Sequence, residues 1–187
     1  MSSYSRPWKT DGVLDTHLVP PEGQDFCERV RVNGTDQIWS KPWNVVAHND
    51  YTPYVQDRPG TVMAKDPLSE VGCPYAVRGF DFGYVGLIWL DDLVRRRDRW
   101  VVQVDSVHES GMRLIKTRAL YEGAIAPSGP NGAILLEKVA QAYRILLSRA
   151  IRGLFLWASD QETCQHLRNS FKSPSAHTCP QEGGQPS

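Results

Sequence analysis

Two short segments of the chain combine residue types that bind phosphate groups. In the first, Arg78, Gly79 and Asp81 lie in a turn directly before an apolar run. A glycine lets a phosphate or a nucleic-acid backbone approach the main chain closely. In the second, Arg149 lies near the end of an amphipathic segment, where its guanidinium can fork onto phosphate oxygens. Both segments indicate contacts with phosphate.

Each segment also has an ordinary structural interpretation. Arg-Gly-Phe-Asp is compatible with a tight surface turn. An arginine near a helix C-terminus interacts favourably with the helix dipole, which applies to Arg144, Arg149 and Arg152. The basic cluster from Arg95 to Arg99 could contact phosphates, but a solvated hairpin tip explains it as well. Residue types alone leave these alternatives open.

Other chemistry finds little support in the sequence. Asp91, Asp92 and Glu109 could in principle hold Mg²⁺ as a nuclease does, but the accompanying lysine on a neighbouring strand is not evident. The five histidines are scattered. The nucleotide-binding loop G-x-x-x-x-G-K-[ST] occurs nowhere in the chain. We therefore expect no complete nucleotide site within this sequence.

The composition predicts one soluble cytoplasmic domain. The chain has 187 residues, of which 41% are hydrophobic and 22% are charged. Its 21 basic and 21 acidic side chains cancel, so no global field favours DNA or a membrane surface. It has no apolar run long enough to span a membrane. The four cysteines have no paired spacing, which predicts a reduced protein without disulfides or zinc.

The order of expected elements predicts an α/β layer with parallel strands. Asn33-Gly34 is typical of a two-residue hairpin turn, and Gly153 is expected to end the longest helix. Ser159 to Glu162 resembles a capping box. We expect strands at 28–32, 35–39, 84–90 and 154–158, a hairpin over 93–104, and helices at 108–123, 133–152 and from the capping box to about 171.

Taken together, the segments resemble the C-terminal part of the DUF2075 family of superfamily 1 DNA/RNA helicases. The resemblance runs from about Tyr4 to Leu167, and the order of its segments is more specific than any one of them. The matching segments are Tyr4–Lys9, Lys41–Asn44, Glu70–Cys73, Gly79–Asp81, Asp91–Val94, Tyr143–Arg149 and Asp160–Thr163.

This resemblance implies a single RecA-like domain, the second of a helicase. Such a domain has a mostly parallel sheet, a β-hairpin insertion and helices on both faces. We expect it to cover residues 26–171, with an irregular N-terminal segment over 1–25 and a disordered tail over 172–187. The first strand of the family's domain is expected to be incomplete here, which would leave an open sheet edge.

The resemblance also implies roles for individual residues. The turn around Gly79 resembles helicase motif V, so Arg78, Gly79 and Asp81 are expected to face the nucleotide. Arg149 corresponds to the motif VI arginine that reaches the γ-phosphate. Tyr75 and Arg144 are expected to contact DNA or RNA. The chain departs from the family in having Arg78 where Gln is frequent and Ser148 where Thr is usual.

Two functions follow as expectations. The chain could be the C-terminal half of a helicase-like NTPase, with Arg149 as an arginine finger and with ATP and Mg²⁺ held only when a Walker-bearing half completes the site. Alternatively, it could be a non-catalytic module that binds nucleic acid or a protein. The first predicts no ATPase activity from the chain alone.

Overall fold

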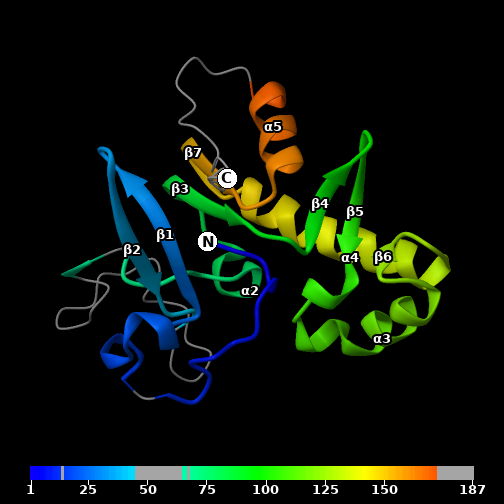
Figure 1. Cartoon of the computed structure of the whole chain (residues 1–187), viewed down its shortest axis with the longest axis horizontal. Coiled ribbons are helices and arrows are strands. Elements are labelled where there is room, and N and C mark those ends of the chain that lie inside the picture. Colours follow the sequence, from blue (N-terminus) through cyan, green and yellow to red (C-terminus); the bar gives the residue numbers. More distant parts are fainter. Residues whose placement is uncertain (14, 45–64, 67, 172–187) are drawn as a thin grey trace, which may run out of the picture.

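A computed structural model of the chain describes residues 1–13, 15–44, 65–66 and 68–171. Figure 1 shows strands and helices interleaved along the sequence, as expected for an α/β protein. The tail predicted to be disordered, residues 172–187, lies outside the described residues. The strands are β1 (Phe26–Val32), β2 (Thr35–Lys41), β3 (Phe82–Trp89), β4 (Leu93–Arg96), β5 (Arg99–Gln103), β6 (Ile125–Ala126) and β7 (Ala150–Ala158). The α-helices are α2 (Pro74–Val77), α3 (Arg113–Glu122), α4 (Pro130–Leu147) and α5 (Gln161–Ser170).

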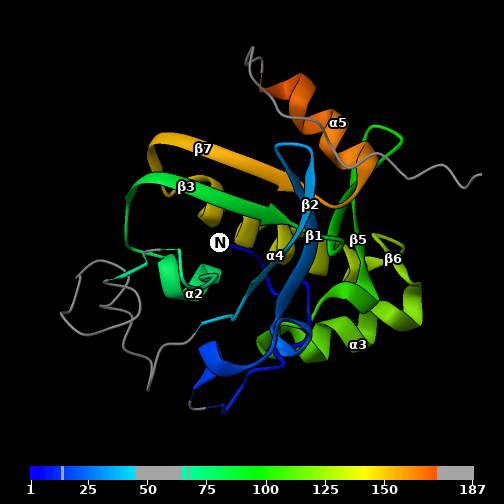
Figure 2. The ribbon, with the colours of Figure 1, turned by 60° about the vertical axis from the view of Figure 1, so that its left-hand side comes forward.

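The centre of the fold is the parallel pair of β3 and β7. Their register runs from Phe82 opposite Ala150 to Trp89 opposite Ala158. The connection between them contains the β4–β5 hairpin, α3 and α4, and α4 runs along one side of the pair (Figures 1 and 2). On the far side of β3, Ser2 forms a short parallel bridge with Ile88. The predicted α/β class with parallel strands is confirmed, and the remaining sheets are antiparallel.

The core lies between α4 and the strands. Apolar residues at helical spacing place one face of α4 inside, and alternate residues of β3 point toward it. Trp89 stacks on Tyr143 of α4, with ring centroids 4.0 Å apart. The buried hydrophobic side chains of these two elements are Val85, Leu87 and Trp89 on β3 and Leu135, Val139, Tyr143 and Leu146 on α4. This packing fixes where α4 ends relative to the strands.

Both predicted hairpins are present. β1 and β2 pair in antiparallel register across Asn33 and Gly34, whose φ values of 50° and 80° are positive. Positive φ at both central residues is typical of the turn that matches strand twist. The second hairpin joins β4 to β5 through Arg97 and Asp98, which also have positive φ. Its tip is polar, as expected.

Two expected helix boundaries are wrong. α4 ends at Leu147, and Gly153 lies within β7 opposite Tyr84 instead of terminating the helix. The reason is that pairing with β3 takes the backbone from Ala150 onward into the sheet. α3 starts at Arg113, since the residues before it form a 3₁₀ turn in which Glu109 accepts a hydrogen bond from the Gly111 amide. The capping residue Asp160 is confirmed, because its side chain accepts from the Thr163 amide.

The expectation of a chain without disulfides is also wrong. Cys27 and Cys73 are free, whereas Cys164 is disulfide-bonded. Disulfide pairing depends on Cα and Cβ positions in space, so the absence of a sequence pattern could not exclude it. No helix within the described ranges is both long enough and apolar enough to cross a bilayer.

Candidate functional site

The first part of the site is the turn between α2 and β3. Cys73 caps α2: its sulfur accepts hydrogen bonds from the Ala76 amide at 3.4 Å and from the Tyr4 hydroxyl at 3.1 Å. The helix stops at Arg78, and Gly79 then adopts a φ of +86°. A side chain disfavours this left-handed conformation, so glycine is what allows the chain to turn into β3.

The second part is Arg149, where the chain leaves α4 and enters β7. Its Nη1 lies 3.2 Å from Oδ1 of Asp81 and donates to the Phe80 carbonyl at 3.3 Å. Its Nε donates to the Ile145 carbonyl in the last turn of α4. The Phe82 amide in turn donates to the Arg149 carbonyl at 2.8 Å. The glycine turn and Arg149 therefore meet at the amino ends of β3 and β7.

The contacts of Arg149 are weak and partly open to solvent. Its side chain is 22% exposed and that of Asp81 is 61% exposed. Ion pairs at such positions contribute about 0–1 kcal/mol. The carbonyl of Ile145 belongs to the C-terminal turn of α4, where the helix dipole also favours a cation. The guanidinium is thus held by one partly exposed ion pair and by hydrogen bonds to two main-chain carbonyls.

Tyr75 and Arg78 line a separate groove beside this junction. The Arg78 guanidinium lies 5.5 Å from the centroid of the Tyr75 ring, and both side chains are exposed. The groove has a volume of about 170 Å³ and is also lined by Lys138 and Gln141 of α4. Arg144 is exposed on α4 but does not line this groove. Of the two residues expected to contact nucleic acid, only Tyr75 therefore lines this groove.

Sequence reasoning missed Lys138 and Gln141. Both lie on α4, three residues apart, and Ile145 follows four residues later on the same side of the helix and also lines the groove. This spacing is visible in the sequence. What the sequence does not reveal is that α2 packs against that side of α4.

The carboxylates considered for Mg²⁺ point in different directions. Asp92 is buried and accepts hydrogen bonds from the Tyr143 hydroxyl at 2.6 Å and the Ser3 hydroxyl at 2.7 Å. Burial raises the pKa of Asp92 to about 6. Asp91 instead accepts from the Ser159 hydroxyl. Within the part of the chain that the structure describes, no group of three or more His, Cys, Asp or Glu side chains could hold a metal ion.

The basic hairpin tip has a structural contact of its own. Arg96 makes two parallel hydrogen bonds to Asp160, at 2.9 and 2.7 Å, and this carboxylate also caps α5. Hydrogen bonds to Arg96 and Thr163 hold the pKa of Asp160 below its usual value despite its burial. The Arg97 amide donates to Glu162 in the first turn of α5. These contacts dock the hairpin against α5, which is the structural interpretation of part of the cluster.

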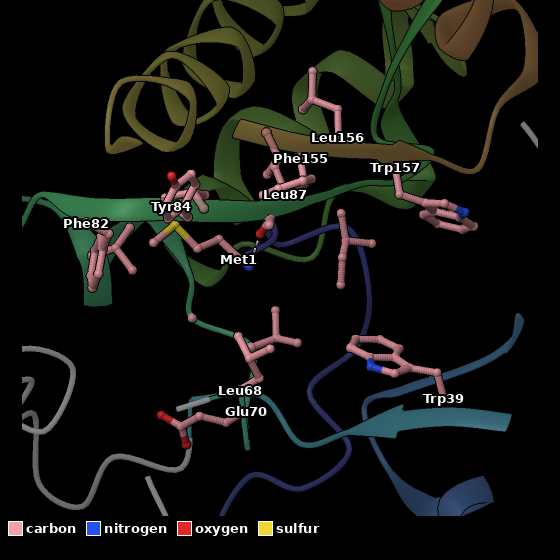
Figure 3. A pocket seen from close by; sticks show the side chains of 16 residues that line it. Met1, Trp39, Leu68, Glu70, Phe82, Tyr84, Leu87, Phe155, Leu156 and Trp157 are labelled. Carbon is pink, nitrogen blue, oxygen red and sulfur yellow. Dashed lines mark hydrogen bonds between the residues drawn. The ribbon is translucent and has the colours of Figure 1, made fainter. Parts of the chain in front are cut away.

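A larger cavity of about 490 Å³ lies on the face of β3 and β7 away from α4. Figure 3 shows Tyr84 and Phe155 on the sheet side of this cavity, and Trp39 projecting from β2 on the opposite side. Tyr84 is 64% exposed and Phe155 is 69% exposed, with ring centroids 6.3 Å apart. Leu68 is also exposed at its edge. The cavity is mainly apolar and carries no cluster of charged groups.

Comparison with known proteins gives a match to a protein family. Residues 4–160 match a family described as Schlafen group 3, DNA/RNA helicase domain. No curated protein matches the chain, and no solved structure does. The match confirms the helicase-like domain that the sequence predicted, while membership of DUF2075 stays a prediction.

Proposed function

Because the chain belongs to the Schlafen group 3 DNA/RNA helicase domain family, we propose that it is the C-terminal half of a helicase-like NTPase. In this proposal Arg149 acts as an arginine finger on a nucleotide held by a P-loop-bearing region. The chain has no G-x-x-x-x-G-K-[ST] loop. That region must therefore come from elsewhere, either from another part of a longer polypeptide or from a separate protein.

The observation that carries the proposal is the junction of the two phosphate-binding segments. Arg149 contacts Asp81 and the Phe80 carbonyl, although 69 positions separate Phe80 from Arg149 in the sequence. Two segments with these residue types meet at one end of a parallel strand pair. If the two segments were only a surface turn and a helix end, nothing would require them to be adjacent in the fold.

The energetics allow Arg149 to change partners. Separating it from Asp81 costs on the order of 1 kcal/mol at most, since the pair is partly exposed. An arginine finger stabilises the charge on a transferring phosphoryl group and accelerates hydrolysis by about 10³–10⁵-fold. This acceleration corresponds to about 4–7 kcal/mol, which exceeds the cost of separating Arg149 from Asp81. The hydrogen bonds to the Phe80 and Ile145 carbonyls must also exchange for contacts with the phosphate. Asp81 can therefore hold the guanidinium near its working position without preventing its transfer to a phosphate.

Gly79 and Arg78 would assist in different ways. Gly79 leaves open space where a side chain would stand, so a phosphate can approach the main chain there. The guanidinium of Arg78 adds positive charge to the same loop. ATP and Mg²⁺ would be bound mainly by the P-loop-bearing region, and this chain would contribute transition-state stabilisation.

A second candidate is a non-catalytic module that binds nucleic acid or protein. The observation favouring it is that each terminal nitrogen of Arg149 already has a partner: the Phe80 carbonyl with Asp81 for Nη1, and the Ser148 hydroxyl for Nη2. In this case Arg149 is a structural clamp between α4 and the loop before β3. Exposed Tyr75 and Arg144 would then serve binding without hydrolysis.

The two candidates are separated by a reconstitution experiment. The chain is mixed with a separately purified, P-loop-bearing helicase domain from a member of the same family, and phosphate release from ATP is measured. We expect no activity from the chain alone and stimulation in the mixture. Arg149→Ala should abolish that stimulation, because Arg78, the other arginine of these two loops, has its guanidinium over the Tyr75 ring instead of at the junction.

Arg152→Ala is the matched control. Arg152 is exposed on β7, three residues beyond Arg149, so its loss removes the same charge without altering the junction. Stimulation that survives Arg149→Ala as fully as Arg152→Ala would refute the arginine-finger role and favour the binding module. Hydrolysis by the chain alone would contradict the division into two halves.

A further inference from the structure

We propose that the groove between α2 and α4 binds one unit of a single-stranded nucleic acid, with Lys138 and Gln141 as binding residues beside Tyr75 and Arg78. This inference deepens the nucleic-acid-binding part of the proposed function and rests on it. It does not require that Arg149 act on a nucleotide. It also assigns a binding role to two residues for which neither the sequence nor the family match provides one.

The groove joins side chains from elements far apart in the sequence. Tyr75 and Arg78 come from α2 and its C-terminal cap, whereas Lys138 and Gln141 come from the middle of α4. Its volume of about 170 Å³ is below the roughly 300–1,000 Å³ of pockets that enclose a drug-sized ligand. The groove therefore suits a single base or phosphate and is too small to enclose a nucleoside triphosphate.

The side chains match the two chemical parts of a nucleotide unit. Tyr75 is 42% exposed, and the Arg78 guanidinium lies over its ring, 5.5 Å from the centroid. A base can therefore stack on the exposed part of Tyr75 or on the outer face of the guanidinium. Lys138 supplies a second cation from the opposite wall. Gln141 donates only a long hydrogen bond of 3.4 Å to Glu137, so its amide can turn toward a base edge.

Glu109 determines how a strand can lie in the groove. This carboxylate also lines the groove, is 9% exposed, and accepts a hydrogen bond from the Gly111 amide at 3.0 Å. Burial and the proximity of Glu109 raise the pKa of the Tyr75 hydroxyl, so it stays neutral. A phosphate would be repelled by Glu109. The phosphates must therefore run along the rim between Arg78 and Lys138, with the base toward Tyr75.

The test is fluorescence anisotropy of labelled oligo(dT) and oligo(rU) with the full chain, titrated over a range of salt concentrations. Lys138→Gln should weaken binding roughly eightfold at 50 mM salt and lower the salt slope by about 0.7, the value for one phosphate contact on a single strand. Tyr75→Ala should weaken binding by roughly fivefold to a hundredfold through lost stacking, and Tyr75→Phe should retain it. The two oligonucleotides show whether DNA or RNA is preferred.

Arg118→Gln on α3 is the matched control, since Arg118 is exposed and does not line the groove. It should change binding by less than about twofold, since it removes no direct phosphate contact. Two results would contradict the proposal that this groove binds nucleic acid. One is an equal effect of Lys138→Gln and Arg118→Gln, and the other is no binding by the wild-type chain at 50 mM salt. Urea midpoints measured for each variant exclude loss of folding as the cause. Either negative result leaves an Arg149-dependent stimulation of ATP hydrolysis intact, so the two proposals fail separately.

Discussion

The two faces of the β3–β7 pair differ in how they are covered. On one face, α4 buries Trp89 against Tyr143, and Leu146 is fully buried nearby. On the other face, Tyr84 and Phe155 remain largely exposed beside an apolar cavity. Parallel strands in α/β proteins are normally covered on both sides, and both faces of this pair carry apolar side chains accordingly.

The contrast shows where the fold obtains its stability. Side chains on the covered face lose their contact with water when the protein folds, which contributes about 25 cal/mol for each Å² of apolar surface. Side chains on the open face lose much less. Substitutions should therefore have large effects on the α4 side, intermediate effects in the loop that leads into β3, and small effects on the open side.

The largest effect is expected from Leu146→Ala on the covered face. Leu146 is fully buried, so the substitution removes apolar contacts and leaves a cavity, at a cost of about 2–5 kcal/mol. Urea unfolding followed by circular dichroism measures this loss. A cost below about 1 kcal/mol would show that packing against α4 is not the main source of stability, and the two faces would then not differ as described.

Asp92→Asn tests the buried polar contact between the strands and α4. The pKa of Asp92 is raised to about 6, above the value near 3.9 expected in the unfolded chain. The folded state thus binds more protons between these pH values, and this contribution to stability is present at low pH and is lost as pH rises through about 6. Asparagine cannot ionise, so it removes this dependence.

The free energy of unfolding of Asp92→Asn, relative to wild type, should therefore increase by up to about 3 kcal/mol from pH 4 to pH 8. Urea titrations of both proteins over this range give the difference directly. Because the other titrating groups are common to both proteins, their contributions cancel. Parallel curves would mean that Asp92 ionises normally in the folded state.

Gly79→Ala tests the loop that leads from α2 into β3. Gly79 has a φ of +86° and open space around it, so alanine meets no atoms but adopts a left-handed conformation at a cost of about 1–2 kcal/mol. The matched control is Gly86→Ala in β3, which also meets no atoms and has no positive φ. That control should be neutral or stabilising, since glycine weakens a strand interior. If both substitutions changed the free energy of unfolding equally, the positive φ of Gly79 could not be the cause of the loss.

The smallest effect is expected from Phe155→Thr on the open face. Threonine has good strand propensity, and Phe155 is 69% exposed, so the free energy of unfolding should change by less than about 0.5 kcal/mol. Binding of the dye ANS, which reports exposed apolar surface, should decrease. A loss of several kcal/mol would indicate that this face is covered in solution.

Local sequence patterns predicted the elements that short-range interactions determine. Asn33-Gly34 specifies its hairpin turn through backbone conformation alone, and Asp160 specifies the start of α5 through one capping bond. The end of α4 was mispredicted at Gly153, since pairing between β7 and β3 overrides the local preference for glycine after a helix. Boundaries set by distant partners are not visible in a local pattern.

The same distinction between local and long-range determinants applies to the candidate site. Gly79 and Arg149 could be selected from residue type and spacing, and their meeting follows from the parallel order of the strands. Lys138 and Gln141 could not be selected, because their relevance depends on α2 lying against α4. Likewise, the apolar residues around Asp92 did not reveal that Tyr143 and Ser3 would hold its carboxylate in the core.

The stacking of Trp89 has an optical consequence. Its indole stacks with Trp100, with centroids 5.2 Å apart and planes at 25°, and also with Tyr143. Two indoles held this closely at a fixed angle couple their electronic transitions and produce a near-ultraviolet dichroic band. The band depends on fixed packing among β3, β5 and α4, so it vanishes when a compact state keeps its helices but loses its side-chain order. The intensity of this band therefore reports directly whether the side chains of the core are ordered.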